Sequence, residues 1–576
     1  MVGKALSMAA SIDIIVTPGF KELTGRLSSL EDLAQILAPV DRRQLVRHSV
    51  RVLNSLAVSR QTGLADSQEA FLEALPVDLR ARYRDFAATS DAPVQLLHPA
   101  QQLVLVHAAA RYGHVEGGMG LGNPAARAAW ATACLYVNDH LTKDPVLAGG
   151  LRSWEKALHL FSEEAARWEL INPSRPDKAL ARIRALFTTV AARTPELSAA
   201  ADRLRGAFIE QLGIDMETAY NLTAFLILHW TGESRKRPAD PDAALVNRQT
   251  WLENCSIPLD QFDRYLGTVS LRLEEIVPAF DALKVGMSFR DVLPFRRSPL
   301  FRIDDNGVAF LAPQLMSEKG GIDFLWLLTN PPGGAREKHM FTDDFSLLYE
   351  NYIRMVLEDL GPWLGGTYVP DVAYSGADGA GQIDGLILSG RTLAVVEVKA
   401  SLIRQILLAS GTVDAVRDDL ERKFVGDRDN RKGLSQLAHA IQWLADERRA
   451  GRIVRGIDLR PVDTVIPILV IAERHLRFPG VGQWFDYQLQ QMLRPVWARV
   501  GPVILCGTED LENLEHLARR GTTRIMDVFL DYSRRAKRAQ WPLWQYYEPT
   551  RGPHPRLNGL MDTWFKELVD RRIMLK

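Results

Sequence analysis

Residues 382–401, QIDGLILSGRTLAVVEVKAS, contain two short apolar runs on either side of a turn signal built around Gly390. Two such runs separated by a few turn-forming residues predict a β-hairpin. Side chains alternate along a strand, so Glu397 and Lys399 share one face of the second run, while Val396, Val398 and Ala400 point to the other. Asp384 lies in the first run, where a hairpin can bring it beside Glu397.

The residue types at these positions suit a hard divalent cation. Mg²⁺ prefers oxygen ligands and is often held by one or two carboxylates plus substrate phosphate. Asp384 and Glu397 offer two carboxylates, and Lys399 could orient a water or hold charge that develops in a transition state. The stretch therefore predicts a site where a bound metal activates water and offsets charge on a phosphoryl oxygen.

The pattern Asp384…Glu397-Val398-Lys399 resembles the D…(D/E)-x-K core of the PD-(D/E)XK nucleases, the restriction-endonuclease-like superfamily. The resemblance covers residues 341–520 and implies an α/β core, in which helices flank a mixed central sheet. It also implies Mg²⁺-dependent hydrolysis of phosphodiester bonds that leaves 5′-phosphate ends, with Mn²⁺ as a possible substitute. Asp384, Glu397 and the Val398 carbonyl would bind the metal, and Lys399 would position the attacking water.

Other interpretations of the pattern stay open. A D…ExK string arises by chance in a chain with 24% charged residues, and surface strands carry Glu and Lys for solubility. An inactive nuclease-like fold could also serve as a nucleic-acid-binding or protein-interaction module, although such a fold has no chemical reason to keep all three residues. Pro370-Asp371 spells the PD of the superfamily name, but Asp384 is preferred as the ligand, and Asp371 is expected in a turn or at a strand start.

Two further residues are candidates for the site. Phe341–Leu360 predicts an amphipathic helix, and its Glu350 resembles the metal-site glutamate that many superfamily members carry on the helix before the core sheet. A solvated helix glutamate is the equal alternative. Gln436 matches the start of a Q-x-x-x-Y signature of the exonuclease-like branch, but Ala440 replaces the tyrosine, and endonuclease activity is favoured. Gln436, with Lys432 one turn earlier, could still meet the metal or a phosphate.

The chain has 576 residues, too many for one core, and predicts several domains. Residues 1–240 read as consecutive helices that could recognise substrate, hold a protein partner or a second copy, or regulate the nuclease. Residues 241–340 form a connecting segment with a β-hairpin at Asp305–Gly307. Residues 341–520 form the nuclease domain, and residues 521–576 a helical extension. The predicted fold is thus an all-α N-terminal region followed by a restriction-endonuclease-like α/β core.

Charge gives little guidance on partners. Lysine plus arginine and aspartate plus glutamate are equal at 70 each, so nucleic-acid binding would need a local basic surface. One candidate is residues 531–547, where Arg534, Arg535 and Arg538 stand close to several aromatic residues, although packing of those aromatics on the nuclease domain is favoured. The resemblance favours DNA as the substrate and leaves RNA open. A large non-catalytic region joined to such a nuclease also resembles bacterial defence or restriction effectors.

The remaining compositional signals concern location. Cys134, Cys255 and Cys506 are far apart and lack metal-ligand spacing, so they read as buried thiols in a reducing compartment. No apolar run approaches the length needed to cross a membrane. We therefore expect a cytoplasmic protein without a membrane partner.

Overall fold

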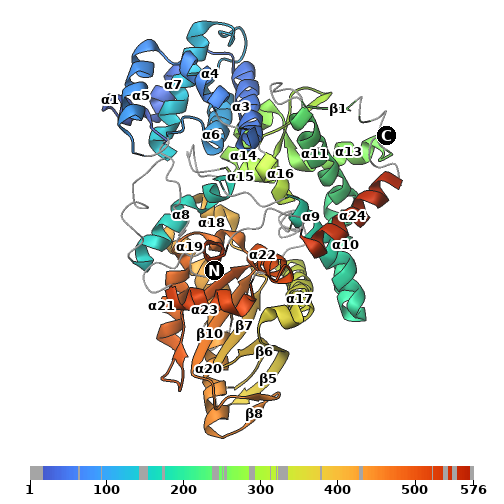
Figure 1. Ribbon diagram of the computed structural model, residues 1–576. Helices are drawn as coiled ribbons and strands as arrows, with labels where there is room; N and C mark the ends of the chain where they lie inside the picture. The colour runs from blue at the N-terminus through green and yellow to red at the C-terminus, as the bar shows by residue number, and fades with distance from the viewer. Residues whose placement is uncertain are drawn as a thin grey trace.

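The computed structural model describes residues 17–570, except for 63–64, 92–93, 142–152, 172–175, 237–244, 249–250, 252–255, 284–291, 312, 320, 322–334, 377–378, 411, 427–431, 522, 536–541 and 548–553. The first helices gather at one end of the molecule, and the larger sheet lies at the other (Figure 1). In the described part of the chain, no helix is both long and apolar enough to cross a bilayer.

The predicted helical N-terminal region is confirmed. Its helices are α1 (Phe20–Thr24), α2 (Leu30–Leu37), α3 (Arg42–Thr62), α4 (Ala65–Ala74), α5 (Val77–Thr89), α6 (Pro99–Tyr112), α7 (Pro124–Leu141), α8 (Trp154–Ile171), α9 (Pro176–Ala185), α10 (Pro195–Leu212) and α11 (Met216–Lys236). Residues 99–110 of α6 are all buried. Gln101 is tolerated there because its Nε2 donates to the carbonyls of Leu96 and Cys134 and to Oδ1 of Asn138.

A small four-stranded sheet follows, in the order β1-β4-β3-β2. Its elements are β1 (Val246–Asn247), α13 (Leu259–Val269), β2 (Ser270–Leu271), α14 (Leu273–Asp281), α15 (Leu293–Arg297), β3 (Leu300–Arg302), β4 (Gly307–Phe310) and α16 (Pro313–Lys319). The hairpin expected at Asp305–Gly307 is confirmed, because β3 and β4 pair antiparallel around it. Asp304 Oδ1 fixes the turn by accepting from the N–H groups of Asn306 and Gly307, at 2.9 and 2.7 Å.

The larger sheet is mixed, with the strand order β11-β10-β7-β6-β5 and β12 paired to β10. Its strands are β5 (Thr367–Gly376), β6 (Gly379–Ser389), β7 (Thr392–Lys399), β10 (Thr464–Ile471), β11 (Arg499–Val500) and β12 (Ile504–Gly507). β5, β6 and β7 pair antiparallel, whereas β7, β10 and β12 are parallel. β7 is central and buried from Thr392 to Val398, as its valine-rich sequence requires.

The predicted β6–β7 hairpin is confirmed. Ser389 pairs with Thr392 across a two-residue turn, in which Gly390 has φ +57°. A positive φ at the first central position is typical of tight hairpins and strongly favours glycine. The ladder between the two strands ends at Gly385 and Val396, just before the acidic residues.

Helices cover both faces of this sheet. α17 (Ala335–Leu360) packs on the face of β7 that carries Val396 and Val398, and α20 (Leu434–Arg449) packs on the face that carries Leu393 and Val395. α22 (Thr508–Arg519) joins the α17 side, and α19 (Val413–Leu420) and α21 (Val481–Met492) join the α20 side. Shorter elements are η5 (Gly361–Leu364), α18 (Gln405–Ser410), η6 (Glu421–Val425), β8 (Ile453–Val454), β9 (Ile457–Asp458) and η7 (Arg474–Arg477).

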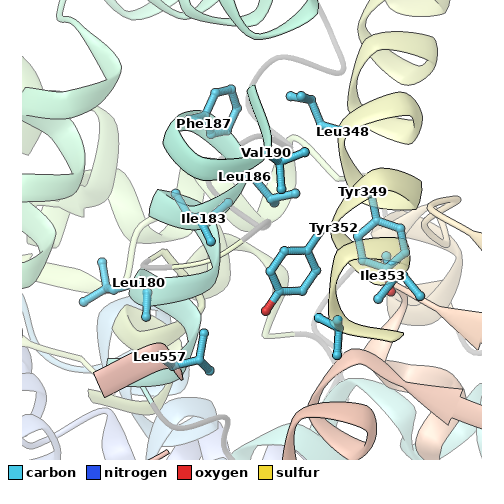
Figure 2. Packing of buried hydrophobic residues seen from close by; sticks show 14 of the residues in the cluster. Leu180, Ile183, Leu186, Phe187, Val190, Leu348, Tyr349, Tyr352, Ile353 and Leu557 are labelled. Atoms are coloured by element: carbon cyan, nitrogen blue, oxygen red, sulfur yellow. The ribbon is translucent and has the colours of Figure 1, made fainter. Parts of the chain in front are cut away.

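One apolar cluster joins the α17 face to distant parts of the chain. Its members include residues of α9 and of the π-helical turn η2 (Leu186–Val190), which follows it, as well as α17 and α24 (Pro555–Asp570). Figure 2 shows Ile183 and Val190 opposite Tyr352 of α17, with Leu557 at the lower edge. The remaining described elements are η3 (Ala191–Arg193), α23 (Ile525–Arg535) and η8 (Leu543–Tyr546).

Candidate active site

Glu397 and Lys399 lie at the carboxyl end of β7. Only 2% of Glu397 is exposed, and the side chain of Lys399 is 17% exposed. Lys399 Nζ lies 2.7 Å from Glu397 Oε1. The alternative that this strand carries Glu397 and Lys399 on the surface for solubility is therefore excluded, because the Glu397 side chain is buried.

Asp384 is held against the same strand by a main-chain bond. Its Oδ2 accepts from the N–H of Val398 at 2.7 Å. Because the β6–β7 ladder has already ended at Gly385 and Val396, the carboxylate takes the position that a strand carbonyl would otherwise occupy. The hairpin thus brings Asp384 to the E-x-K segment.

Glu350 approaches from α17. It is half-buried, and burial together with the neighbouring Asp384 charge raises its pKa to about 7. The positive charge of Lys399 acts in the opposite direction. Glu350 is therefore part of the same electrostatic cluster, although it lies in a helix and the other members lie in strands.

Burial dominates the electrostatics of the strand residues. It raises the pKa of Glu397 to about 8, with a further contribution from the Asp384 charge, and it raises the pKa of Asp384. Burial alone would lower the pKa of Lys399, but Glu397 and Asp384 outweigh it and the pKa is raised. The cluster thus combines three carboxyl groups that resist ionisation with one lysine that holds its proton.

The residues present fit a divalent cation. In the described part of the chain, no three His, Cys, Asp or Glu side chains are already gathered around one metal position, but Mg²⁺ needs only one or two carboxylates when water and phosphate complete its shell. Glu397 Oε1 has Lys399 as an ion-pair partner, yet it is buried and receives no aligned hydrogen bond. A buried oxygen of this kind has an unused lone pair available for a cation.

The structure adds two residues to the cluster: Asp371, which the sequence analysis set aside, and Arg354, which it did not consider. Asp371 was expected in a turn or at a strand start, but it lies in the middle of β5 with φ +49°. It accepts from Arg354 and, at 3.0 Å, from Gln382 Nε2. Both Asp371 and Arg354 act on the pKa of Glu350 and of Asp384. The available signal was the spacing of Glu350 and Arg354, four residues apart on one helix face.

Gln436 and Lys432 lie at the start of α20, where both take part in capping. Gln436 Oε1 accepts from the N–H of Gly433 at 2.8 Å, and the Lys432 N–H donates to Ser435 Oγ at 2.8 Å. Gly433 has φ +47°, and an added Cβ would meet the Phe424 carbonyl oxygen at 2.0 Å. The contacts of Gln436 therefore give it a role in forming the helix.

The basic segment after α22 is only partly described. Arg534 and Arg535 are exposed at the end of α23, and Arg535 pairs with Asp531 at 2.7 Å. Arg538 lies outside the described residues. The favoured packing of the aromatics is confirmed for Tyr547, which is buried and donates to Asp510 Oδ1 at 2.8 Å.

Comparison with protein-family models, with curated proteins and with solved structures finds no match for this chain.

Proposed function

We propose that this protein is a metal-dependent nuclease with a restriction-endonuclease-like core. The observation that carries the proposal is the convergence of three carboxyl groups, one buried and two partly buried, with Lys399 around the carboxyl end of β7. A buried acidic cluster with raised pKa values is costly unless a function requires it. The mixed sheet, with α17 on one face and α20 on the other, supports the core that the sequence resemblance implies.

The free energy needed to ionise buried Glu397 is large, so its place in the core calls for an explanation. Raising the pKa of Glu397 from 4.5 to about 8 corresponds to roughly 5 kcal/mol of preference for the protonated form. A cation held by the same oxygens would reverse that preference, because an opposite charge favours the ionised carboxylate. The energetics therefore favour a cation-binding role over a purely structural one.

Each residue has a distinct role in the proposed reaction. Asp384, Glu397 and the Val398 carbonyl would hold Mg²⁺ or Mn²⁺. Glu350, on α17, would add a third carboxylate beside the metal. The bound metal supplies a water of lowered pKa and offsets charge on the phosphoryl oxygen. Lys399, held in place by Glu397, would orient the attacking water and stabilise charge as the phosphodiester bond breaks.

The substrate is proposed to be DNA, with RNA as the second polymer to test, and the cleavage is proposed to be internal. The experiment compares supercoiled plasmid, linear duplex, single-stranded DNA and RNA, each with Mg²⁺ or Mn²⁺. The variants are Lys399→Ala and Asp384→Asn, and the control is Lys566→Ala, which changes an exposed lysine of α24.

We expect both site variants to lose cleavage by at least about 100-fold while they keep the wild-type melting profile, because they remove transition-state stabilisation or the metal. Lys566→Ala should cleave like the wild type. Cleavage that survives both site substitutions would disprove the proposed site. A wild-type protein that cleaves none of the four polymers would favour the inactive binding module.

A further inference from the structure

A group of three cations follows the candidate catalytic strand. The carboxylate of Asp419 accepts from the main chain and the Nε of Arg404, both at 3.1 Å, and from Lys423 Nζ at 2.8 Å. It also accepts from Arg422. Lys423 donates in addition to the carbonyl of Leu402 at 2.5 Å. We call Arg404, Arg422 and Lys423 the cation cluster.

The cation cluster lies at the same edge of the sheet as Lys399. The Lys399 carbonyl accepts from the N–H of Ala472, which follows β10, and Glu473 beside it accepts from the N–H of Ile403. Arg404 is five residues after Lys399 in the sequence, so their Cα atoms are within about 18 Å of each other. A polymer bound at Lys399 would therefore pass close to the cluster.

The cluster carries more positive charge than Asp419 can balance. The Asp419 side chain is fully buried, whereas the side chains of Arg404 and Arg422 are 46% and 55% exposed. Lys423 is 21% exposed and by itself neutralises Asp419. The positive charges of the two arginines are therefore not needed to balance Asp419.

The nearby acids offset only part of this surplus. Arg422 and Lys423 face Asp419 because residues three and four apart share one side of a helix. Asp414 pairs with Arg417. Asp418 lies four residues before Arg422 and therefore on its side of the helix, but it is exposed, and solvent weakens its effect on the arginine. Glu473 is buried and bonded to His475.

Arg404 and Arg422 are also held ready for an anion. Each donates to Asp419 through part of its guanidinium group, and a guanidinium has five N–H donors in a planar fork that matches phosphate. Anchoring by a buried carboxylate restricts the side chain before binding, which reduces the entropy lost on association.

We propose that Arg404 and Arg422 bind backbone phosphates of the nucleic acid and hold the strand against the end of β7. This assignment rests on the proposed nuclease function, because it names where that substrate lies. Lys423 and Asp419 form an ion pair without net charge beneath the phosphate site, and Lys423 also holds the segment after Lys399 through the Leu402 carbonyl.

The test measures binding separately from cleavage. Fluorescein-labelled duplex and single-stranded DNA are titrated with full-length protein in EDTA over a series of salt concentrations, and plasmid cleavage is followed in Mg²⁺. The variant is Arg404→Gln/Arg422→Gln, in which the amides can still donate to Asp419. The matched control is Arg391→Gln, which removes a 73% exposed, ion-paired arginine at the opposite end of β7.

We expect the double variant to flatten the slope of log K against log salt by about 1.4–1.8 and to weaken binding roughly tenfold at moderate salt. Its melting temperature should stay at the wild-type value, and Arg391→Gln should bind like the wild type. A purely structural role for the arginines would change the melting temperature and leave the salt slope unchanged.

The outcomes separate the two proposals. If the wild type binds and cleaves while the double variant keeps its affinity and salt slope, the phosphate site is wrong and the nuclease proposal stands. If Arg391→Gln lowers the slope as much as the double variant does, binding is not localised to this edge and the inference also fails. If the wild type neither binds nor cleaves DNA, both proposals fail.

Discussion

The ionised form of Glu397 is disfavoured by its surroundings. It is buried beside Asp384 and within the influence of Glu350, and Lys399 offsets only part of the resulting repulsion. Glu515 in α22 is also buried, but the neighbouring His554 and Arg556 side chains outweigh burial and lower its pKa to about 2. The two glutamates therefore allow one substitution to be compared in opposite environments.

We predict that Glu397→Gln raises the melting temperature of the metal-free protein by a few degrees at pH 7.5, because it removes a carboxylate that the fold disfavours. Glu515→Gln should lower it, since it removes a favoured charge. Mg²⁺ should stabilise the wild type and have little effect on Glu397→Gln. Calorimetry with and without Mg²⁺ checks all three, and a lower melting temperature for metal-free Glu397→Gln would contradict the repulsion argument.

At the residue scale, the sequence indicates which residues come together better than it indicates how deeply each one is buried. Asp384, Glu397 and Lys399 can be found because alternation and residue type together indicate a cation site. The burial of Glu397 could not be predicted, since it depends on β10, which is more than 60 residues away in the sequence. The positive φ of Asp371 could not be predicted either, because no local sequence pattern requires it there.

At the element scale, the start of α20 depends on a close backbone approach. Gly433 combines φ +47° with a carbonyl oxygen 2.0 Å from the position of an added Cβ. Gly451, just after the same helix, has φ +67° but open space around it. Both positions disfavour a side chain, but only the first also has a steric obstacle.

We predict that Gly433→Ala destabilises the protein far more than Gly451→Ala. The control should cost about 1–2 kcal/mol for the left-handed conformation, whereas the test substitution adds a backbone clash of the kind that gives the largest single-residue losses. Urea unfolding of both variants measures the difference. Equal losses would show that the α20 start can move away from Phe424.

The acid sensitivity of α24 docking is a second prediction at this scale. Glu515 accepts from Arg556 at 2.7 Å, and its folded pKa of about 2 lies below its ordinary 4.5. A depressed pKa means that the stabilisation is fully present above pH 4.5 and is lost as the pH falls towards 2. The full contribution is about 3 kcal/mol.

The difference in melting temperature between the wild type and Glu515→Gln should therefore be constant from pH 5 to 7 and shrink below pH 4.5. Thermal unfolding at half-unit pH steps gives the curve. A difference that stays constant down to pH 3 would mean that the pKa of Glu515 is not depressed in the folded protein.

Elements whose signal is local were predicted well. The β6–β7 hairpin, the β3–β4 hairpin and the helix at Phe341–Leu360 follow from turn residues, apolar runs and helical spacing. The pairing of β7 with β10 could not be read in the same way, because parallel strands are joined through a crossover that carries no register signal.

At the scale of the whole molecule, ion pairs connect the N-terminal helices to the sheet region. Arg182 of α9 makes a bidentate contact with Glu512 of α22 at 2.8 and 2.7 Å, and both side chains are buried. Arg193 pairs with Glu358 of α17 at 2.7 Å, but both side chains are about one-third exposed. The two pairs differ in solvent exposure and not in kind.

We predict that Arg182→Met lowers the unfolding free energy by about 3–5 kcal/mol, because it leaves a buried carboxylate without its partner. Arg193→Met should cost at most about 1 kcal/mol. Differential scanning calorimetry of both variants provides the comparison. A loss for Arg182→Met as small as that for Arg193→Met would show that Glu512 finds another partner or a proton.

The shared core was not visible in the sequence. Tyr349 and Tyr352 are fully buried in a cluster that draws on the consecutive elements α9 and η2 and on α24, which lies hundreds of residues later in the chain. Helical spacing shows that one face of the Phe341–Leu360 helix is apolar, but not which of the remaining helices covers it.

The Glu515–Arg556 contact also has a consequence in time, because a ribosome makes α24 long after it makes β7. At 5–20 residues per second, the interval between Lys399 and Arg556 is on the order of 10–30 s. During that interval, β7 first lacks its parallel neighbour β10, and α22 then lacks the arginine that pairs with its Glu515. This delay separates the synthesis of Glu397 and Lys399 from the completion of the core that holds them.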